Sequence, residues 1–346
     1  AASDVYKRQI LFLGGGSTVT IAQRMFEGMN SFALLAIPLY TFAGFTMSKG
    51  GISKRLMDFC YSIVGHIYGG LAHVNVLSSM IFAGISGSAV ADTAGVSGMF
   101  MPEMIRKGYS KNFTVAVTAI SSTIGIIIPP SIPMVVIAGI CGISTGKLFL
   151  GGIIPGILCG LAQMIVSYFL AKKEGVPKEP GHFTIGPVLH GLWESWPALL
   201  MPIIIVGTIT MGIVSPTEAG VIAVVYGLFA GGIIYRELKW EDIKFAFAET
   251  VRTSGRIFIV IGAAKLYTVM LTTAGFDKWV AKTMLGFSTN PTVILIMILL
   301  IFFIVTMFME SIATLTLFMP ILYPIALGVG INPIVLSVLI TVVIGI

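Results

Sequence analysis

Residues 84–136 read GISGSAVADTAGVSGMFMPEMIRKGYSKNFTVAVTAISSTIGIIIPPSIPMVV, and this stretch decides the fold. Its apolar pieces are too short to cross a bilayer, which takes about 20 helical residues. Residues 71–85 and 96–105 flank the small and polar run SGSAVADTAG at 86–95. Further along the chain, the paired prolines Pro129-Pro130 must break the helix that runs into them. We expect the polar run 86–95 to be the turn that joins two of these half-length pieces. Half-length pieces joined by polar, Gly- or Pro-rich turns are typical of re-entrant hairpins and discontinuous helices, whose backbone must be buried in protein or line a cavity.

The rest of the chain divides into spanning and non-spanning segments. Residues 112–126 and 134–144 read as the two halves of a helix broken at the prolines. Residues 53–68 have one apolar face and predict an amphipathic helix along the membrane surface, and 240–252 is a weaker case. The segments long enough to span a bilayer are 30–48, 148–171, 188–213, 218–235 and 253–272.

Composition excludes the soluble classes. Of 346 residues, 56% are hydrophobic and 10% are charged, whereas a soluble domain has about 25% charged residues. The net charge of +6 is therefore expected in loops that face anionic lipid headgroups, with no nucleic acid as partner. Cys60, Cys141 and Cys159 lie in apolar runs without a CxxC motif, so we expect neither a disulfide framework nor a transition-metal site. The sequence predicts an all-α polytopic membrane protein.

An internal repeat is visible at an offset of 218 residues. Phe100-Met101-Pro102 recurs as Phe318-Met319-Pro320, and at the same offset Asp92-Thr93 falls on Glu310-Ser311. Transporters are commonly built from such repeats, with the substrate site at the interface. We place the first repeat at about 17–171, a linker at 172–187 and the second repeat at about 188–346, within one domain over 10–346.

The basic residues predict that the repeat is inverted. The loops near 49–55, 103–111, 172–178 and 236–256 hold 14 Lys and Arg residues, and the opposite side holds 4. The positive-inside rule makes the first set cytoplasmic. One hairpin then enters from the cytoplasm and the other, residues 290–331, from outside.

Both ends of the sequence differ from what lies between them. Residues 1–9, AASDVYKRQ, are polar and resemble translated adapter sequence, so we leave them out of the fold prediction. The end from Val335 to Ile346 stops within an apolar run. The repeat offset places a second Pro-Pro break one residue beyond Ile346. We therefore expect a fragment that lacks part of its second repeat.

Four charged residues lie within apolar stretches, where a charge costs at least about 2.5–3.5 kcal/mol: Asp92, Glu218, Lys265 and Glu310. Ser86, Ser88, Asp92 and Thr93 supply oxygen ligands at the first hairpin tip, as does Ser121-Ser122-Thr123 with Gly125 before the prolines. Oxygen cages of this kind suit Na⁺, and half-helix N-termini beside them suit an anionic substrate. The alternative is that these small residues only allow close helix packing.

The other candidates have simpler interpretations. Glu218, in Ser215-Pro216-Thr217-Glu218, is typical of a helix start with a capping carboxylate. Lys265 either pairs with an acid or extends to the membrane surface, and the sequence does not decide between them. The chain contains no HExxH, GxSxG or P-loop motif, so we do not expect an enzyme.

Residues 84–136 resemble the large membrane subunit (DctM type) of tripartite ATP-independent periplasmic (TRAP) transporters. SFALLAIPLY (31–40), SPTEAGVIAVVYGL (215–228) and MESIATLTLFMPILYPIA (309–326) are similar to the same family. Relative to the family pattern, two N-terminal helices and the end of the second repeat, with its Thr-Pro-Pro loop, are absent. The resemblance implies an elevator-type transporter in the bacterial inner membrane, with two hairpins and two broken helices that slide against a scaffold.

The resemblance also implies a function, partners and site residues. Na⁺ would drive uptake of a carboxylate, with no other cofactor, and a periplasmic binding protein would deliver that carboxylate to a complex with a small four-helix membrane subunit. The implied first cation site is Ser88, Asp92, Thr93, Ser122, Gly125 and Pro129. The implied second site is Glu310, Ser311 and Thr314, and the implied substrate neighbours are Ser86, Gly87 and Ser131.

Two alternatives remain open at this point. A stand-alone Na⁺-coupled dicarboxylate carrier or antiporter would share this architecture, and a neighbouring gene for a binding protein would separate it from a TRAP subunit. A non-transporting membrane assembly factor or a membrane-embedded enzyme is the remote alternative. Paired acids at hairpin tips argue against it, because a scaffold does not need them.

Overall fold

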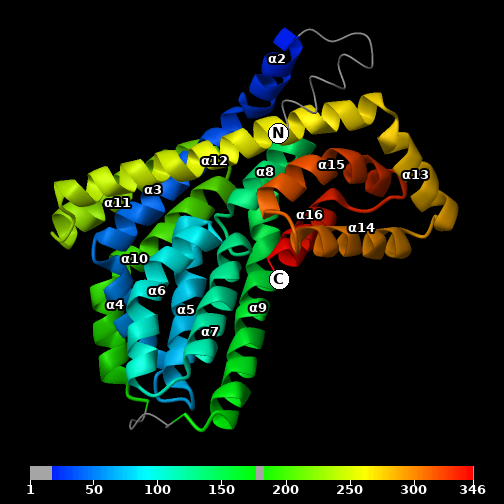
Figure 1. Cartoon of the computed structure of the whole chain (residues 1–346). Coiled ribbons are helices and arrows are strands. Elements are labelled where there is room, and N and C mark those ends of the chain that lie inside the picture. The colour runs from blue at the N-terminus through cyan, green and yellow to red at the C-terminus, as the bar shows by residue number, and fades with distance from the viewer. Residues whose placement is uncertain (1–17, 177–182, 346) are drawn as a thin grey trace.

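The computed structural model describes residues 18–176 and 183–345, and all regular structure within them is helical (Figure 1). The excluded segment 1–9 and the start of the first repeat lie outside the described residues. Before the gap the helices are α2 (Thr18–Met29), η1 (Phe32–Leu35), α3 (Ala36–Lys49), α4 (Ile52–Val64), α5 (Gly70–Ser86), α6 (Ala89–Arg106), α7 (Lys111–Thr123), η2 (Ile124–Ile126), α8 (Ile132–Cys141) and α9 (Thr145–Lys173). After it they are α10 (Ile185–Thr210), α11 (Pro216–Phe229), η3 (Ala230–Ile234), α12 (Trp240–Thr273), α13 (Phe276–Phe287), α14 (Pro291–Thr306), α15 (Ser311–Gly328) and α16 (Pro333–Ile344).

Within residues 18–176 and 183–345, six helical segments are long and apolar enough to span a membrane, which confirms a multi-pass protein. Five of them correspond to the five predicted spans. The sixth, Ser311–Gly328, belongs to the predicted second hairpin, and its partner α14 is shorter. Gly70–Ser86, Ile132–Cys141 and Pro333–Ile344 are likewise short apolar helices.

The first polar turn is much shorter than the sequence predicted. The structure ends α5 at Ser86 and begins α6 at Ala89, so that only Gly87 and Ser88 separate them. The Ser88 hydroxyl caps α6 by accepting from the Ala91 N–H at 3.4 Å. The run of small residues after this cap continues as helix, since alanine is a strong helix former. The expectation of a ten-residue turn at 86–95 was wrong.

The break at the prolines is confirmed. Helix α7 ends at Thr123 and passes through the short turn η2, and α8 begins at Ile132. Pro129-Pro130 is a cis peptide between the two halves. Ser131 caps α8: its hydroxyl accepts from the Met134 N–H at 3.3 Å and donates to the Ile126 carbonyl at 2.5 Å. One serine therefore fixes both sides of the interruption.

The two predicted surface helices differ in outcome. Helix α4 forms a separate element, and Leu56, Phe59 and Cys60 on its apolar face are buried. Residues 240–252 are not a separate helix, because they continue into 253–272 as the single 34-residue helix α12. The stretch contains no proline, and the Asp242 carboxylate accepts from the Lys239 N–H at 3.0 Å to start it. Nothing in the sequence ends the helix before Thr273.

Helix α9 has two contrasting faces. On one face Gly152, Gly156 and Gly160 are spaced by four residues, and a Cβ on them would overlap Met134, Ile128 and Met80, respectively. Small residues at this spacing let neighbouring elements pack against the helix backbone. The other face exposes large apolar side chains as a lipid-facing surface would: Leu150, Ile154, Leu158, Leu161 and Ile165.

Helix α12 joins the two halves of the structure. Figure 1 shows it running across the top, with α5, α6, α7 and α9 below one part of it and α14 to α16 below the other. It contacts α2 and α3 of the first half and α15 of the second, while α8 packs on α15 and α9 on α16. The surfaces between α12, α8 and α15 are therefore formed by elements from both halves.

Candidate functional site

A cavity of about 440 Å³ lies where the interrupted elements of both halves meet α12. Its walls come from the turn between α5 and α6, the break before α8, the turn between α14 and α15, and the middle of α12. Gly87 and Ser88 line the first wall, Ile132 and Pro133 the second, and Glu310 the third. Segments more than 200 residues apart in the chain thus share one cavity.

Three helix N-termini converge on this cavity. The lining includes the cap or first turn of α6, of α8 and of α15. Ser88, Ser131 and Glu310 are the respective N-cap residues. Each N-terminus carries a partial positive charge of roughly half an elementary charge, and its first N–H groups have no acceptor within the helix. The N-terminus of α15 is already occupied by the Glu310 carboxylate, so the N-termini of α6 and α8 are the backbone groups that favour an anion here.

The first turn and the proline break are held in direct contact. The Gly87 carbonyl accepts from the Ile132 N–H at 3.1 Å. Gly87 has φ +63°, and a Cβ there would overlap the Pro130 carbonyl oxygen, so glycine meets a conformational and a steric demand. A Cβ on Gly125 would lie 3.3 Å from the Ser88 carbonyl oxygen. The structure therefore brings Ser88, Gly125 and the Pro129-Pro130 loop together.

Asp92 is fully buried in the first turns of α6. Among the described residues, neither of its carboxylate oxygens has a hydrogen-bond partner. The Ser79 and Ser122 hydroxyls lie within interaction range, on α5 and α7. Ser79 donates to Ser121 at 3.2 Å, and Ser122 donates to the Thr118 carbonyl at 2.8 Å. Each hydroxyl has a hydrogen-bond partner of its own, and its oxygen lies beside the Asp92 carboxylate.

Thr93 does not share this environment. Its side chain is exposed, and its hydroxyl donates to the Ala89 carbonyl at 2.8 Å on its own helix. Consecutive helical residues point about 100° apart, so a buried Asp92 places Thr93 on the flank. Of the residues predicted for the first cation site, the structure groups Ser122 with Asp92 and Gly125 with Ser88, and leaves the Thr93 side chain apart.

Glu310, Ser311 and Thr314 lie together at the start of α15. The exposed Glu310 carboxylate caps this helix, accepting from the N–H groups of Ile312 at 2.9 Å and Ala313 at 3.2 Å. The buried Thr314 hydroxyl donates to the Glu310 carbonyl at 3.2 Å, and that of Ser311 to the Ile344 carbonyl of α16 at 3.5 Å. Asp92 thus lies within the first turn of α6, whereas Glu310 is the N-cap residue of α15.

Sequence reasoning missed Arg256, because it counted this residue among the basic residues of the loop 236–256. The structure places Arg256 within α12, where it lines the 440 Å³ cavity. Within the described ranges no ion pair involves its guanidinium. Glu310 lines the same cavity, but its carboxylate is engaged by the α15 amides. The signal that would have found Arg256 is the uninterrupted helical pattern through 240–273.

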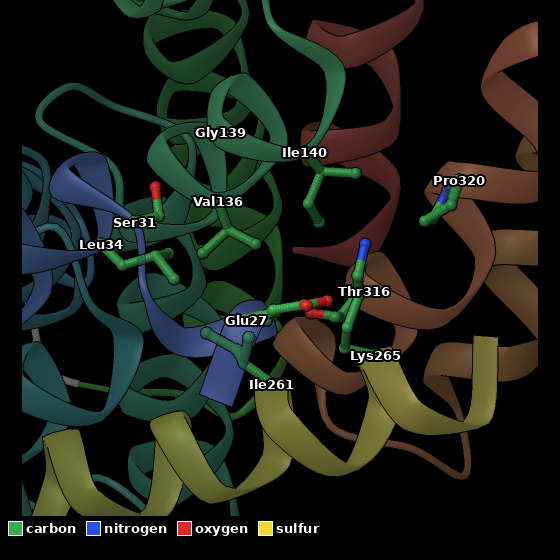
Figure 2. Close-up of a pocket in the computed structure, with 11 residues that line it drawn as sticks. Glu27, Ser31, Leu34, Val136, Gly139, Ile140, Ile261, Lys265, Thr316 and Pro320 are labelled. Carbon is green, nitrogen blue, oxygen red and sulfur yellow. The ribbon is translucent and has the colours of Figure 1, made fainter. Parts of the chain in front are cut away.

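The two other charges found in apolar stretches have different environments. Glu218 forms a capping box: its carboxylate accepts from the Ser215 N–H at 2.7 Å, and its N–H donates to the Ser215 hydroxyl at 3.3 Å. This confirms its interpretation as a helix start. Lys265 lines a second, smaller cavity of about 220 Å³ (Figure 2). In the part of the chain that the structure describes, no group of three His, Cys, Asp or Glu residues is placed to hold a metal ion.

The family model of the tripartite ATP-independent periplasmic transporter DctM component matches residues 5–346. The chain belongs to this family. It is 38% identical over 314 residues to the isethionate TRAP transporter permease protein DctMQ of Oleidesulfovibrio alaskensis, which covers 91% of this chain and 49% of that protein. It therefore spans about half the length of that relative.

Two further relatives are large permease proteins. The sialic acid protein SiaM of Vibrio cholerae is 37% identical over 90% of this chain and 73% of its own length. The C4-dicarboxylate protein DctM of Pseudomonas aeruginosa is 35% identical over 96% of this chain and 78% of its own length. The DctM-family chain is thus a multi-pass membrane protein whose relatives are named as transporter permeases, consistent with a non-enzymatic role.

Proposed function

We propose that this DctM-family chain carries out Na⁺-coupled secondary uptake of an organic carboxylate across the bacterial inner membrane. The observation that carries the proposal is that a cavity favourable for an anion lies next to a buried carboxylate that favours a cation. The N-termini of α6 and α8 and the guanidinium of Arg256 line the 440 Å³ cavity, and the buried Asp92 lies in the first turns of α6. The first environment favours an anion and the second favours a cation.

The anion site is the cavity itself. N-termini and an arginine are the groups that proteins use to bind carboxylates. Gly87, Ser88 and Ser311 bring the backbone of both turns to its edge. Relatives carry sialic acid, C4-dicarboxylate and isethionate in their names; the first two are carboxylates and the third is a sulfonate, so all three are organic anions. We assign the carboxylate of the substrate to this cavity.

The cation site centres on Asp92. An unpaired carboxylate in a buried position is costly unless a cation or a proton neutralises it. The hydroxyl oxygens of Ser79 and Ser122 lie beside it, and the C-terminal ends of α5 and α7 add carbonyl groups of the kind that coordinate Na⁺ in transporters. Carboxylate, hydroxyl and carbonyl oxygens together make a ligand set for Na⁺.

The remaining parts of the proposal concern partners and motion. Family membership supports a periplasmic binding protein and a small membrane subunit as partners. The cavity is shared between the interrupted elements and the continuous helix α12, which supports an elevator motion in which α5 to α8 and α14 to α16 move against α12. The Na⁺ stays bound at Asp92 while the carboxylate is carried.

Uptake into proteoliposomes tests the coupling ion. Radiolabelled carboxylates and a binding protein are supplied outside, and an inward Na⁺ gradient is compared with a choline control and with a pH gradient. Asp92→Asn keeps the shape of the side chain and removes its charge, and we expect it to abolish Na⁺-stimulated uptake. Glu103→Gln is the matched control, since Glu103 lies on the same helix and pairs with Arg106 at the surface.

The outcomes are separable. Uptake that follows the Na⁺ gradient and is lost only in Asp92→Asn supports the proposal. Uptake driven by the pH gradient and indifferent to Na⁺ would assign a proton to Asp92 instead. Na⁺-driven uptake that survives Asp92→Asn would contradict this site altogether.

A further inference from the structure

The smaller cavity continues the larger one along the same helices. The larger cavity uses Ile132 and Pro133 of α8, and the smaller one uses Val136 and Gly139, one turn further on. On α15 the lining passes in the same way from Ile312 to Thr316, and on α12 it passes from Val260 to Ile261 and then Lys265. The two cavities are therefore successive spaces between α12, α8 and α15.

Lys265 is the functional group of the smaller cavity. Figure 2 shows its side chain rising from α12 so that its amine lies between Ile140 and Pro320. The side chain is partly buried, and none of the ion pairs within the described residues includes it. Its stem is packed against Gly28 of α2, where a Cβ would lie 2.6 Å from the Lys265 Cβ. This contact directs the ammonium into the cavity.

The nearby acid does not neutralise Lys265. Glu27 of α2 also points into the cavity, but its carboxylate pairs with Arg24 at 2.8 Å. Ser31 and Thr316 add hydroxyl groups to the lining. Arg24 lies outside the lining and holds the Glu27 carboxylate on the exposed side of α2, whereas Lys265 has no ion-pair partner among the described residues. A partly desolvated ammonium without a partner favours an anion.

We propose that the cavity around Lys265 is a second binding site for the carboxylate group of the transported anion, next to the cavity around Arg256. The proposal rests on carboxylate transport as the function of this chain. Arg256 and Lys265 are nine positions apart on α12, which is about 13.5 Å of rise and about half a turn of rotation. One carboxylate cannot contact both cations at once. The two cavities are successive stations on a path of the anion along α8 and α15, whose residues line both.

Thiol modification tests the second station without requiring transport. In a background with the three native cysteines replaced by alanine, Ser31→Cys places a thiol in the lining. Its rates of modification by anionic 2-sulfonatoethyl and cationic 2-(trimethylammonium)ethyl methanethiosulfonate are compared in nanodiscs. We expect Lys265→Met to lower the anion-to-cation rate ratio by about tenfold, and Lys265→Arg to restore it. Lys282→Met, on the exposed face of α13, is the control that leaves the ratio unchanged.

Protection by carboxylates completes the test. Acetate, succinate and sialic acid are the probes, and at least one of them is expected to slow modification of Ser31→Cys when Lys265 is present but not in Lys265→Met. An unchanged rate ratio in Lys265→Met would overturn the second station, as would the absence of protection by every probe. Either result can occur while Na⁺-driven uptake persists, in which case the second station fails and the proposed function stands. If the rate ratio and the protection behave as expected but the chain shows no Na⁺-driven uptake, the proposed function fails and the second station stands.

Discussion

Under the proposed function, the positive charge of Arg256 lets the larger cavity bind a carboxylate in preference to a neutral solute. We expect Arg256→Met to raise the KM for carboxylate uptake by about 10- to 100-fold, because a hydrogen bond to a charged group contributes about 1.5–3 kcal/mol. Arg252→Met is the matched control, since Arg252 lies one turn earlier on α12 and pairs with Glu249 at 2.5 Å outside the cavity. Uptake kinetics in proteoliposomes provide the measurement.

The two arginine variants also separate binding from helix damage. A rise in KM confined to Arg256→Met places the guanidinium on the substrate. A similar rise in both variants would indicate a general disturbance of α12. An unchanged KM in Arg256→Met, with or without a lower maximal rate, would contradict carboxylate binding at this residue.

The junction between α5 and α6 depends on a glycine for two separable reasons. Gly87 and Gly142 have similar positive φ angles, +63° and +66°, but only at Gly87 would a Cβ meet another atom, the Pro130 carbonyl oxygen. We expect Gly142→Ala to cost about 1–2 kcal/mol of unfolding free energy for its backbone conformation alone. Gly87→Ala adds an overlap worth about 1–3 kcal/mol and so lowers the midpoint of thermal unfolding further.

Thermal unfolding of the purified protein in detergent, followed by intrinsic fluorescence, measures this difference. Equal midpoints for the two alanine variants would show that the first turn and the proline loop are not in contact. A specific loss in Gly87→Ala would show that this contact contributes to the fold.

Sequence reasoning located interruptions better than continuities. The break before α8 was predicted correctly, since two prolines remove N–H donors and clash with the preceding turn whatever surrounds them. The turn at 86–95 was predicted too long, because Ser, Gly and Asp read as loop formers although a single serine cap allows helix from Ala89 onward. The continuity of α12 was missed because its start is amphipathic, and Arg256 was missed with it.

The candidate site was predictable in its residue types but not in its geometry. Asp92 was singled out because a charge is costly among apolar residues, and it proves to be fully buried. The separation of the Thr93 side chain from Asp92, and the cap made by Glu310, depend on where each helix begins. Helix boundaries are set within one or two residues by local caps, and such a shift turns a side chain from one face to another. The pattern of acids alone does not contain that information.

At the scale of the whole molecule, the sequence predicts that the two repeats are oriented oppositely in the membrane. The basic residues predict that the start of α7 lies on the cytoplasmic side and α13 on the other. We expect cysteines at Lys111 and Lys282, both exposed, to react with a membrane-impermeant thiol reagent from opposite faces of oriented vesicles. Lys278→Cys, on the same helix as Lys282, serves as a control that must react from the same face. Labelling of Lys111→Cys and Lys282→Cys from one face would refute the inverted arrangement.

The glycine face of α9 has a consequence for how this sequence can change over evolutionary time. The contact is formed by a missing side chain on one partner and by Met80, Ile128 and Met134 on the other. Met80 and Met134 are unbranched and flexible and exchange with other apolar side chains at little energetic cost. Ile128, which faces Gly156, is β-branched, and a Cβ on Gly152 would also overlap the Ile127 carbonyl oxygen, so these contacts adjust less easily. Among descendants of this chain, substitutions should therefore accumulate at Met80 and Met134 and remain rare at Ile128, Gly152 and Gly156. The two sides of this one helix contact therefore differ in how many substitutions they tolerate.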